Sequence, residues 1–161
     1  YTGVKLRFCE FPIFENSMLA GLKHLNRIDS VMARSEWEED EFFDGVMLDN
    51  SESIIDGTMT NLFFSKNNVL YTPIIKKSGI NGIMRQVVID NAKLFFKEVC
   101  EIEIKRKTFS SFDEMFVTNS VIKILPVTHL GNKKFLITKG TREMINFFFN
   151  KSKRSKNLEL V

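Results

Sequence analysis

The sequence predicts an α+β domain with a strongly curved sheet. Residues that alternate between apolar and polar mark several strands, and apolar residues at helical spacing mark a few helices. These elements do not follow the regular strand–helix alternation of a doubly wound sheet, and the sequence contains no internal repeat. With 161 residues, of which 43% are hydrophobic, the chain is long and apolar enough for one domain with a real core.

The first half of the chain predicts one amphipathic helix among short strands. Residues 4–9 alternate as a strand with one buried face, and Pro12 ends that strand. Apolar residues at helical spacing then predict a helix from Leu25 to about residue 39. Polar turns separate the next apolar runs, which indicates an antiparallel meander with strands at 43–49, 54–65 and 69–71.

The second half predicts two further helices and several short strands. A glycine-bearing loop at 79–82 precedes a helix from Ile83 to about Lys97. The remaining patterns predict strands at 100–105, 115–117, 121–127 and 135–138, and a terminal helix at 141–150. We therefore expect one domain at residues 1–150, followed by a basic tail at 151–161.

Composition and charge narrow the class of protein. No apolar run approaches the length of a membrane span, and the net charge of +3 is spread along most of the chain. The dense run from Lys151 to Lys156 is expected to be a solvated tail, because no nucleic-acid-binding signature accompanies it. The chain begins Tyr-Thr-Gly, without Met or a signal-like segment, so we expect a fragment or processed piece of a cytoplasmic protein.

The cysteines and histidines do not form a metal-binding pattern. Cys9 and Cys100 lack motif spacing, so both are expected to be buried free thiols. His24 and His129 stand far apart in the sequence, which leaves a metal site without a ligand set. We expect no metal, nucleic acid or membrane as a partner.

Lys23 lies between an apolar run and the predicted amphipathic helix. A lysine that attacks an aldehyde must be neutral, and burial lowers the pKa of an amine. Met18, Leu19 and Leu22 are apolar enough to predict such burial. A lysine at a helix entry is otherwise a solvated surface charge, and this stretch by itself leaves both interpretations open.

Asp56 is followed by Gly57 and by hydroxyl residues that interrupt a strand pair. A carboxylate in such a position can keep a heterocyclic nitrogen protonated, so that the ring accepts electrons from a carbanion. The same residues are also typical of a turn in which the aspartate caps the backbone of an Asp-Gly pair.

Residues 79–85 place glycines directly before a helix. Backbone N–H groups at the start of a helix lie at the positive end of its dipole and suit a phosphate group. No Gly-Lys-Ser/Thr follows, so the loop is not a nucleotide-binding Walker loop. Further along, Asn119 and Ser120 end a predicted strand, where a serine can bind an anion or simply form a turn.

In order and spacing these segments resemble the fold-type IV group of pyridoxal-phosphate (PLP) enzymes. The matching stretches are Gly21-Leu22-Lys23-His24-Leu25-Asn26-Arg27, Asp56-Gly57-Thr58 with Asn61 and Phe63, Gly82-Ile83-Met84-Arg85, and Asp113-Glu114-Met115-Phe116 with Pro126-Val127. The group includes aminodeoxychorismate lyases and the D-amino-acid and branched-chain aminotransferases. The resemblance implies a curved mixed sheet, or pseudo-barrel, flanked by helices.

The resemblance also implies PLP as cofactor and a role for each matching residue. Lys23 would be the Schiff-base lysine and the catalytic base, and Asp56 would contact the ring nitrogen where the family usually has Glu. The phosphate contacts would come from the turn at Gly82, Ile83 and Met84 and from Asn119 and Ser120. His24 and Asn26 would orient the substrate, whereas Arg85 would cap or pair.

Two stretches are more similar to the lyases than to the aminotransferases. They are Gly-x-Lys-His-Leu-Asn-Arg and Tyr71-Thr72-Pro73 followed by Asn81 to Gln86. The resemblance implies a homodimer that eliminates pyruvate from 4-amino-4-deoxychorismate and gives 4-aminobenzoate for folate biosynthesis. An aminotransferase acting on an amino acid and a non-catalytic truncated remnant are the alternatives. The match covers the family's larger C-terminal domain, so its small N-terminal domain is expected to be absent.

Overall fold

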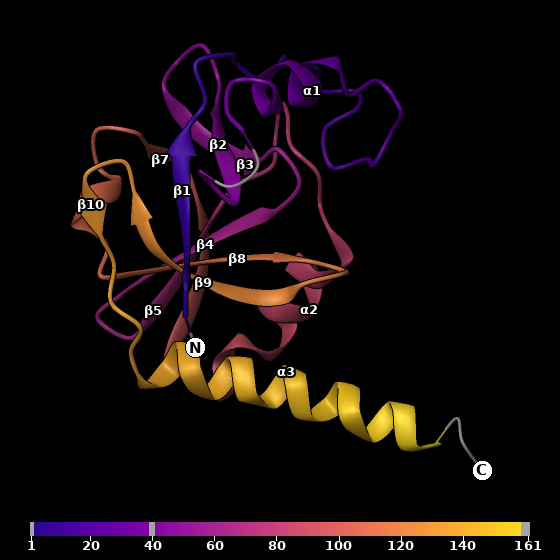
Figure 1. The fold of residues 1–161 in the computed structure, drawn as a ribbon, viewed down its shortest axis with the longest axis vertical. Helices are drawn as coiled ribbons and strands as arrows, with labels where there is room; N and C mark the ends of the chain where they lie inside the picture. Colours follow the sequence, from indigo (N-terminus) through magenta and orange to yellow (C-terminus); the bar gives the residue numbers. More distant parts are fainter. Residues whose placement is uncertain (1, 39–40, 159–161) are drawn as a thin grey trace.

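The computed structural model describes residues 2–38 and 41–158 and confirms the α+β fold (Figure 1). Its helices are α1 Ile28–Arg34, α2 Ile83–Asn91 and α3 Lys139–Leu158, with short 3-10 turns at Ala92–Leu94 and Phe109–Ser111. Its strands are β1 Val4–Phe8, β2 Asp44–Leu48, β3 Ser53–Gly57, β4 Asn61–Lys66, β5 Val69–Pro73, β6 Glu98–Ile102, β7 Ile104–Lys105, β8 Glu114–Asn119, β9 Lys123–Leu130 and β10 Lys133–Lys134.

The described strands form one mixed sheet in the order β6-β5-β4-β8-β9-β1-β2-β3-β7, with β10 paired to β9. Strand β1 pairs in parallel with β2 and β9, and β5 pairs in parallel with β6, whereas the other pairs are antiparallel. Side chains from strands far apart in this order, among them Leu6, Ile54 and Leu62, share one buried cluster. The sheet therefore curls around its own core.

A second core joins the outer face of β4, β5 and β8 to α2 and α3. Because side chains alternate along a strand, Leu62 and Phe64 face the first core while Phe63 faces the helices. The Phe63 and Phe116 rings stack there with centroids 5.0 Å apart. A third cluster, which includes Cys9, lies beneath α1, near the top of Figure 1 and at the opposite end from α3.

Helix α1 is shorter than the pattern from residue 25 to 39 predicts, and residue 39 lies outside the described residues. The apolar side chains that suggest a long helix, Ile28, Val31 and Met32, are exposed, whereas Ala33 is buried. Their spacing therefore reflects an apolar outer surface rather than the packed face of the helix. This is why periodicity overestimates the length of the helix.

The strand expected at 54–65 is two strands, interrupted at residues 58–60. Strand β3 pairs with β2 and β7, while β4 pairs with β5 and β8, so the expected simple meander is wrong. Hydrogen bonds from the 58–60 turn to the side chain of Asp44 accompany the interruption.

Two smaller expectations are also wrong. Residues 135–138 form no strand and make only an isolated bridge from Leu136 to Glu114. Cys100 is half-buried, although Cys9 is buried as expected. Helix α3 continues past residue 150 to Leu158, while the side chains of the basic run from Lys151 to Lys156 and residues 159–161 lie outside the described part of the structure.

Replacing Phe63 with Ala should lower the free energy of unfolding by about 3–5 kcal/mol, because the change leaves a cavity in a fully buried aromatic stack. Denaturant unfolding followed by circular dichroism measures this loss. Leu136→Ala is the control, since that side chain is 66% exposed and should change stability by less than about 0.5 kcal/mol. Equal effects of the two changes would contradict the assigned core.

Candidate functional site

The Lys23 loop is attached to the loop that precedes α2. Gly21 N donates a hydrogen bond to Gly79 O at 2.9 Å, and Asn81 N donates to Gly21 O at 3.1 Å. Gly21 and Gly79 have φ angles of +84° and +90°, in the left-handed region that glycine adopts without a steric penalty. These bonds bring Lys23 close to the start of α2, a segment far from it in the sequence.

A pocket of about 600 Å³ lies where these loops meet the ends of β3, β4 and β8. This volume is within the range of small-molecule sites. The sequence-predicted residues that line it are Lys23, His24, Asp56, Gly82, Ile83, Met84, Asn119 and Ser120. Asn26 does not line it but borders a neighbouring pocket of about 150 Å³, which also includes His24.

Asp56 is a buried carboxylate in the wall of the larger pocket. Its Oδ1 accepts hydrogen bonds from Gly57 N at 3.1 Å and Asn61 Nδ2 at 3.0 Å, and its Oδ2 accepts from Ile80 N at 3.1 Å. Burial raises the pKa of Asp56 from its ordinary 3.8 to about 7, against the opposing effects of the Ile80 N–H group and the Arg27 charge. A cation in the pocket would favour the ionised form.

Asn61 and Arg27 are site residues to which sequence reasoning gives no role. The Asn61 amide nitrogen donates to Asp56 and, at 2.7 Å, to Ile80 O, so it joins β4 to the loop before α2. Arg27 lines the pocket and donates from Nη2 to Thr58 O at 3.3 Å. The family-like Asp56 segment contains Asn61 and could have indicated it. The helical pattern predicts Arg27 on the solvent face of a longer helix, although α1 begins only at the next residue.

The start of α2 forms another wall of the pocket. Gly82 is the N-cap residue and no side chain caps the helix, so the first backbone N–H groups have no partner within the helix. A Cβ atom at Gly82 would lie 2.2 Å from Asn61 Oδ1, so this close contact requires glycine. Arg85 turns away and pairs with Glu101 at 2.6 Å, as its expected pairing role requires.

Asn119 and Ser120 border the pocket where β8 ends. Asn119 Oδ1 accepts hydrogen bonds from Val121 N and Ile122 N, each at 2.9 Å, and Asn119 Nδ2 donates to Met59 O at 3.2 Å. The Asn119 side chain therefore shapes the β8–β9 turn. Ser120 is exposed in the pocket wall, where its hydroxyl group can meet a ligand.

Lys23 is exposed, so the expectation that neighbouring apolar side chains bury it is wrong. Met18 and Leu22 are 85% and 56% exposed because they face outward rather than toward the lysine. Within the described ranges, 2–38 and 41–158, no segment covers this face. Lys23 therefore stands at the open rim of the pocket.

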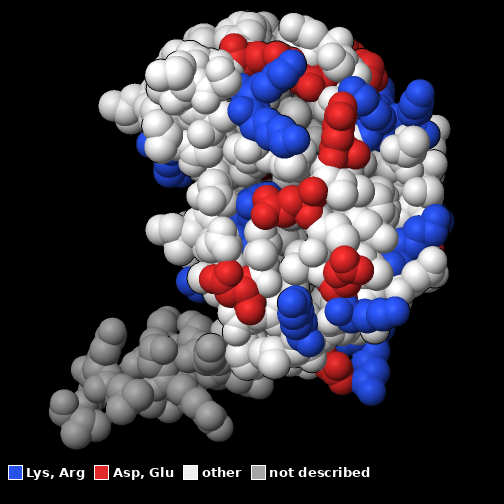
Figure 2. All heavy atoms as spheres, turned by 180° about the vertical axis from the view of Figure 1, so that it is seen from behind, with Lys and Arg blue, Asp and Glu red and all other residues white. Residues whose placement is uncertain are grey.

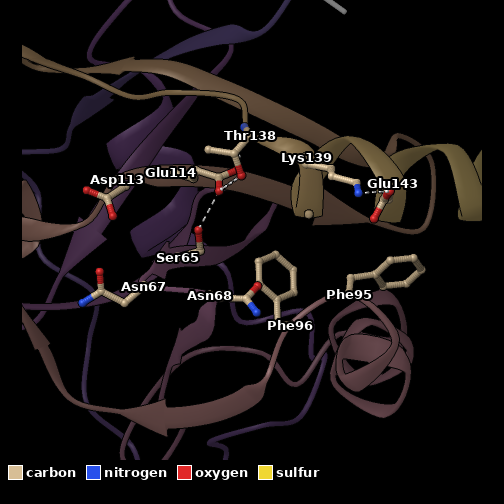
Figure 3. A pocket seen from close by; sticks show the side chains of 11 residues that line it. Ser65, Asn67, Asn68, Phe95, Phe96, Asp113, Glu114, Thr138, Lys139 and Glu143 are labelled. Carbon is tan, nitrogen blue, oxygen red and sulfur yellow. Dashed lines mark hydrogen bonds and ion pairs between the residues drawn. The ribbon is translucent and has the colours of Figure 1, made fainter.

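A second pocket, of about 430 Å³, lies at the other end of β4 and β8 (Figure 3). Its buried Glu114 accepts hydrogen bonds from Ser65 Oγ at 3.0 Å, from Thr138 N at 3.1 Å and from the Thr138 hydroxyl group. These bonds fix the start of α3 and occupy the carboxylate. None of the sequence-predicted site residues lines this pocket, so we assign Glu114 a structural role.

Surface charges do not point to an extended binding surface. Basic and acidic side chains are interspersed over the face in Figure 2. Among the described residues, no group of three or more His, Cys, Asp or Glu side chains could hold a metal ion. No helix in the described ranges is long and apolar enough to cross a membrane.

Comparison with known proteins identifies the family. Residues 7–130 match the family described as amino-transferase class IV. The chain belongs to this family. The aminodeoxychorismate lyase of Vibrio harveyi is 34% identical over 146 residues, which cover 88% of this chain and 54% of that protein. A putative branched-chain-amino-acid aminotransferase of Methanocaldococcus jannaschii is 33% identical over 112 residues, or 70% of this chain and 39% of that protein.

Solved structures of class IV enzymes share the fold. The 4-amino-4-deoxychorismate lyase of Pseudomonas aeruginosa superposes with a TM-score of 0.88 and 30% identity, covering 92% of this chain and 55% of that one. A branched-chain amino acid aminotransferase of T.th., complexed with N-(5'-phosphopyridoxyl)-L-glutamate, gives a TM-score of 0.74 and 25% identity over 83% of this chain and 46% of that one. This chain therefore spans about half the length of the first protein in each comparison.

The raised pKa of Asp56 predicts a pH-dependent stability. The folded protein holds this proton up to about pH 7, above the ordinary value of 3.8, so the stabilisation is complete below about pH 4 and is lost as the pH rises to about 7. The free energy of unfolding should fall between about pH 5 and 8 by on the order of 1–3 kcal/mol more in the wild type than in Asp56→Asn. Urea titrations at several pH values measure the difference, and parallel pH profiles would contradict the assignment.

Proposed function

We propose that this chain forms the PLP-binding part of an aminodeoxychorismate lyase. The observation that carries the proposal is the convergence of Lys23, Asp56 and the start of α2 on one pocket of about 600 Å³. An amine, a buried carboxylate and a set of helix N-terminal N–H groups match the aldehyde, ring nitrogen and phosphate of PLP. Class IV enzymes use this cofactor, and the phosphopyridoxyl complex named above belongs to a protein of the same fold.

The residues in the pocket fit the cofactor's three polar ends. The uncapped N–H groups of Ile83 and Met84 would hold the phosphate, with the Ser120 hydroxyl group beside them. Asp56 would pair with the ring nitrogen, since a cation there removes the cost of burying an ionised carboxylate. The aspartate is one methylene shorter than the family's usual glutamate, but three hydrogen bonds hold it in the pocket wall.

Lys23 would carry the proton transfers of the reaction. PLP, when bound, withdraws electrons from the substrate carbon next to the amine. Lys23 Nζ would take the proton from C4 of 4-amino-4-deoxychorismate and then return a proton to the departing enolpyruvyl group. The ring becomes aromatic as 4-aminobenzoate and the leaving group becomes pyruvate, in a reaction that belongs to folate biosynthesis. His24, which lines the pocket beside Lys23, would orient the substrate, with Asn26 behind it.

The rest of the whole protein would have to complete the site. The surface around Lys23 is unusually apolar for a free surface, because seven large apolar side chains there are exposed. They are Phe14, Met18, Leu22, Leu25, Ile28, Val31 and Met32. We propose that an N-terminal small domain and the second subunit of a homodimer cover this surface and exclude water from Lys23. Without them, the 161-residue chain would act as a non-catalytic remnant.

An aminotransferase is the second candidate for the same pocket. The two curated relatives named above differ by one percentage point in identity, and one carries a lyase name while the other carries an aminotransferase name. Both activities need the same cofactor and the same lysine. The lyase is favoured because its relative matches 88% of this chain, compared with 70% for the aminotransferase.

Substrate assays on the full-length protein separate the two candidates. Incubation with 4-amino-4-deoxychorismate should release pyruvate and 4-aminobenzoate in equal amounts, measured by chromatography. Incubation with D-alanine or a branched-chain amino acid and a keto-acid acceptor should give no new keto acid. The opposite pattern would make the protein an aminotransferase.

Replacing Lys23 with Ala should abolish pyruvate release and the long-wavelength absorbance of bound PLP in the full-length protein. The amine is the covalent anchor in this proposal, so borohydride reduction should leave a phosphopyridoxyl group on Lys23 that peptide mass analysis detects. Lys97→Ala, outside the pocket, is the matched control and should retain both signals. Lyase activity that survived Lys23→Ala would rule out the proposed role of this residue.

A further inference from the structure

Asp44 is a buried carboxylate on β2 that binds the turn between β3 and β4. Its Oδ1 accepts hydrogen bonds from Thr58 N at 3.1 Å and Thr58 Oγ1 at 2.6 Å, and from its neighbour Gly45 N at 2.8 Å. Its Oδ2 accepts from Thr60 Oγ1 at 2.6 Å and from Met59 N at 3.4 Å. All of these groups donate to Asp44, which is the pattern of an ionised carboxylate.

The same turn separates Asp56 from Asn61, the two residues that meet in the pocket wall. The turn closes tightly, since Gly57 N donates to Thr60 O at 2.7 Å. A Cβ atom at Gly57 would lie 2.4 Å from both Asp44 Oδ2 and Thr60 Oγ1. The backbone on either side of the turn is therefore set by how residues 57–60 pack on Asp44.

We propose that Asp44 is a positioning residue, which fixes the Asp56 turn and adds a second negative charge behind the pocket wall. The charge would favour a cationic ring nitrogen in front of Asp56. Its effect on cofactor binding rests on the function proposed above. Its effect on Asp56 itself does not, because Asp56 titrates in the protein without cofactor.

The surroundings of Asp56 define which charges compete with Asp44. Arg27 lowers the pKa of Asp56 and Asp44 raises it, and Lys23 and His24 line the same pocket. On the other side, Asp44 faces the thiol of Cys9, whose pKa burial and the nearby carboxylates raise to about 12, so the thiol stays neutral. Removing the Asp44 charge should therefore lower the Asp56 titration midpoint.

Three variants of the full-length protein separate the charge of Asp44 from its hydrogen bonds. Asp44→Asn keeps the shape and several acceptor contacts but removes the charge. Thr60→Val keeps the charge and removes one hydrogen bond from the turn. Glu114→Gln is the matched control, a buried carboxylate at the far end of β4 and β8 that also accepts hydrogen bonds.

Carbon-13 NMR titration of Asp56 in the cofactor-free protein and PLP binding by absorbance are the two measurements. In Asp44→Asn we expect the Asp56 midpoint to fall by about one pH unit and PLP to bind about tenfold more weakly. In Thr60→Val we expect PLP binding to weaken several-fold, because Asp56 is less firmly placed. Glu114→Gln should leave both readouts at their wild-type values.

An unchanged Asp56 midpoint in folded Asp44→Asn would overturn the proposed charge effect. If Asp44→Asn does not fold, Thr60→Val decides the matter, and wild-type PLP affinity in that variant would overturn the positioning role. A wild-type protein that binds no PLP would refute the proposed function instead, while the Asp56 midpoint would still test Asp44. The two failures are thus distinguishable.

Discussion

Three hydrogen bonds to the Asp56 carboxylate hold together the segments that build the pocket. Gly57, Asn61 and Ile80 supply the donors, so the end of β3, the start of β4 and the loop before α2 meet at one buried charge. The Lys23 loop is attached to the same place through Gly21. Because a buried carboxylate is costly without partners, this network determines how closely the loops can approach one another. The pocket is a consequence of satisfying that charge.

Much of the site could be predicted because its chemistry depends on short, ordered motifs. Lys23, Asp56 and the Gly82 turn all follow from local sequence, and they line one pocket as the resemblance implies. The curved mixed sheet is also expected. Asn61 and Arg27 receive no role, because their contacts depend on loops that meet only in the folded chain. Spacing along the sequence contains no information about such contacts.

The wrong expectations have a common physical origin. Periodicity reports where apolar residues lie, but not what covers them. Ile28 and Val31 suggest a long packed helix, and Met18 suggests a buried lysine, yet all three side chains are exposed. The break at 58–60 is hidden for the opposite reason, since its cause is Asp44, a carboxylate from another strand. The large apolar surface beside Lys23 is thus consistent with a site that further protein must cover.

The most direct test of the proposed cofactor site is a crystal structure of the full-length protein grown with PLP. We expect the ring nitrogen to lie within hydrogen-bonding distance of Asp56, the phosphate to meet the first N–H groups of α2, and Lys23 to be bonded to the cofactor. PLP bound away from this pocket, or with its ring nitrogen facing solvent rather than Asp56, would contradict the proposed site.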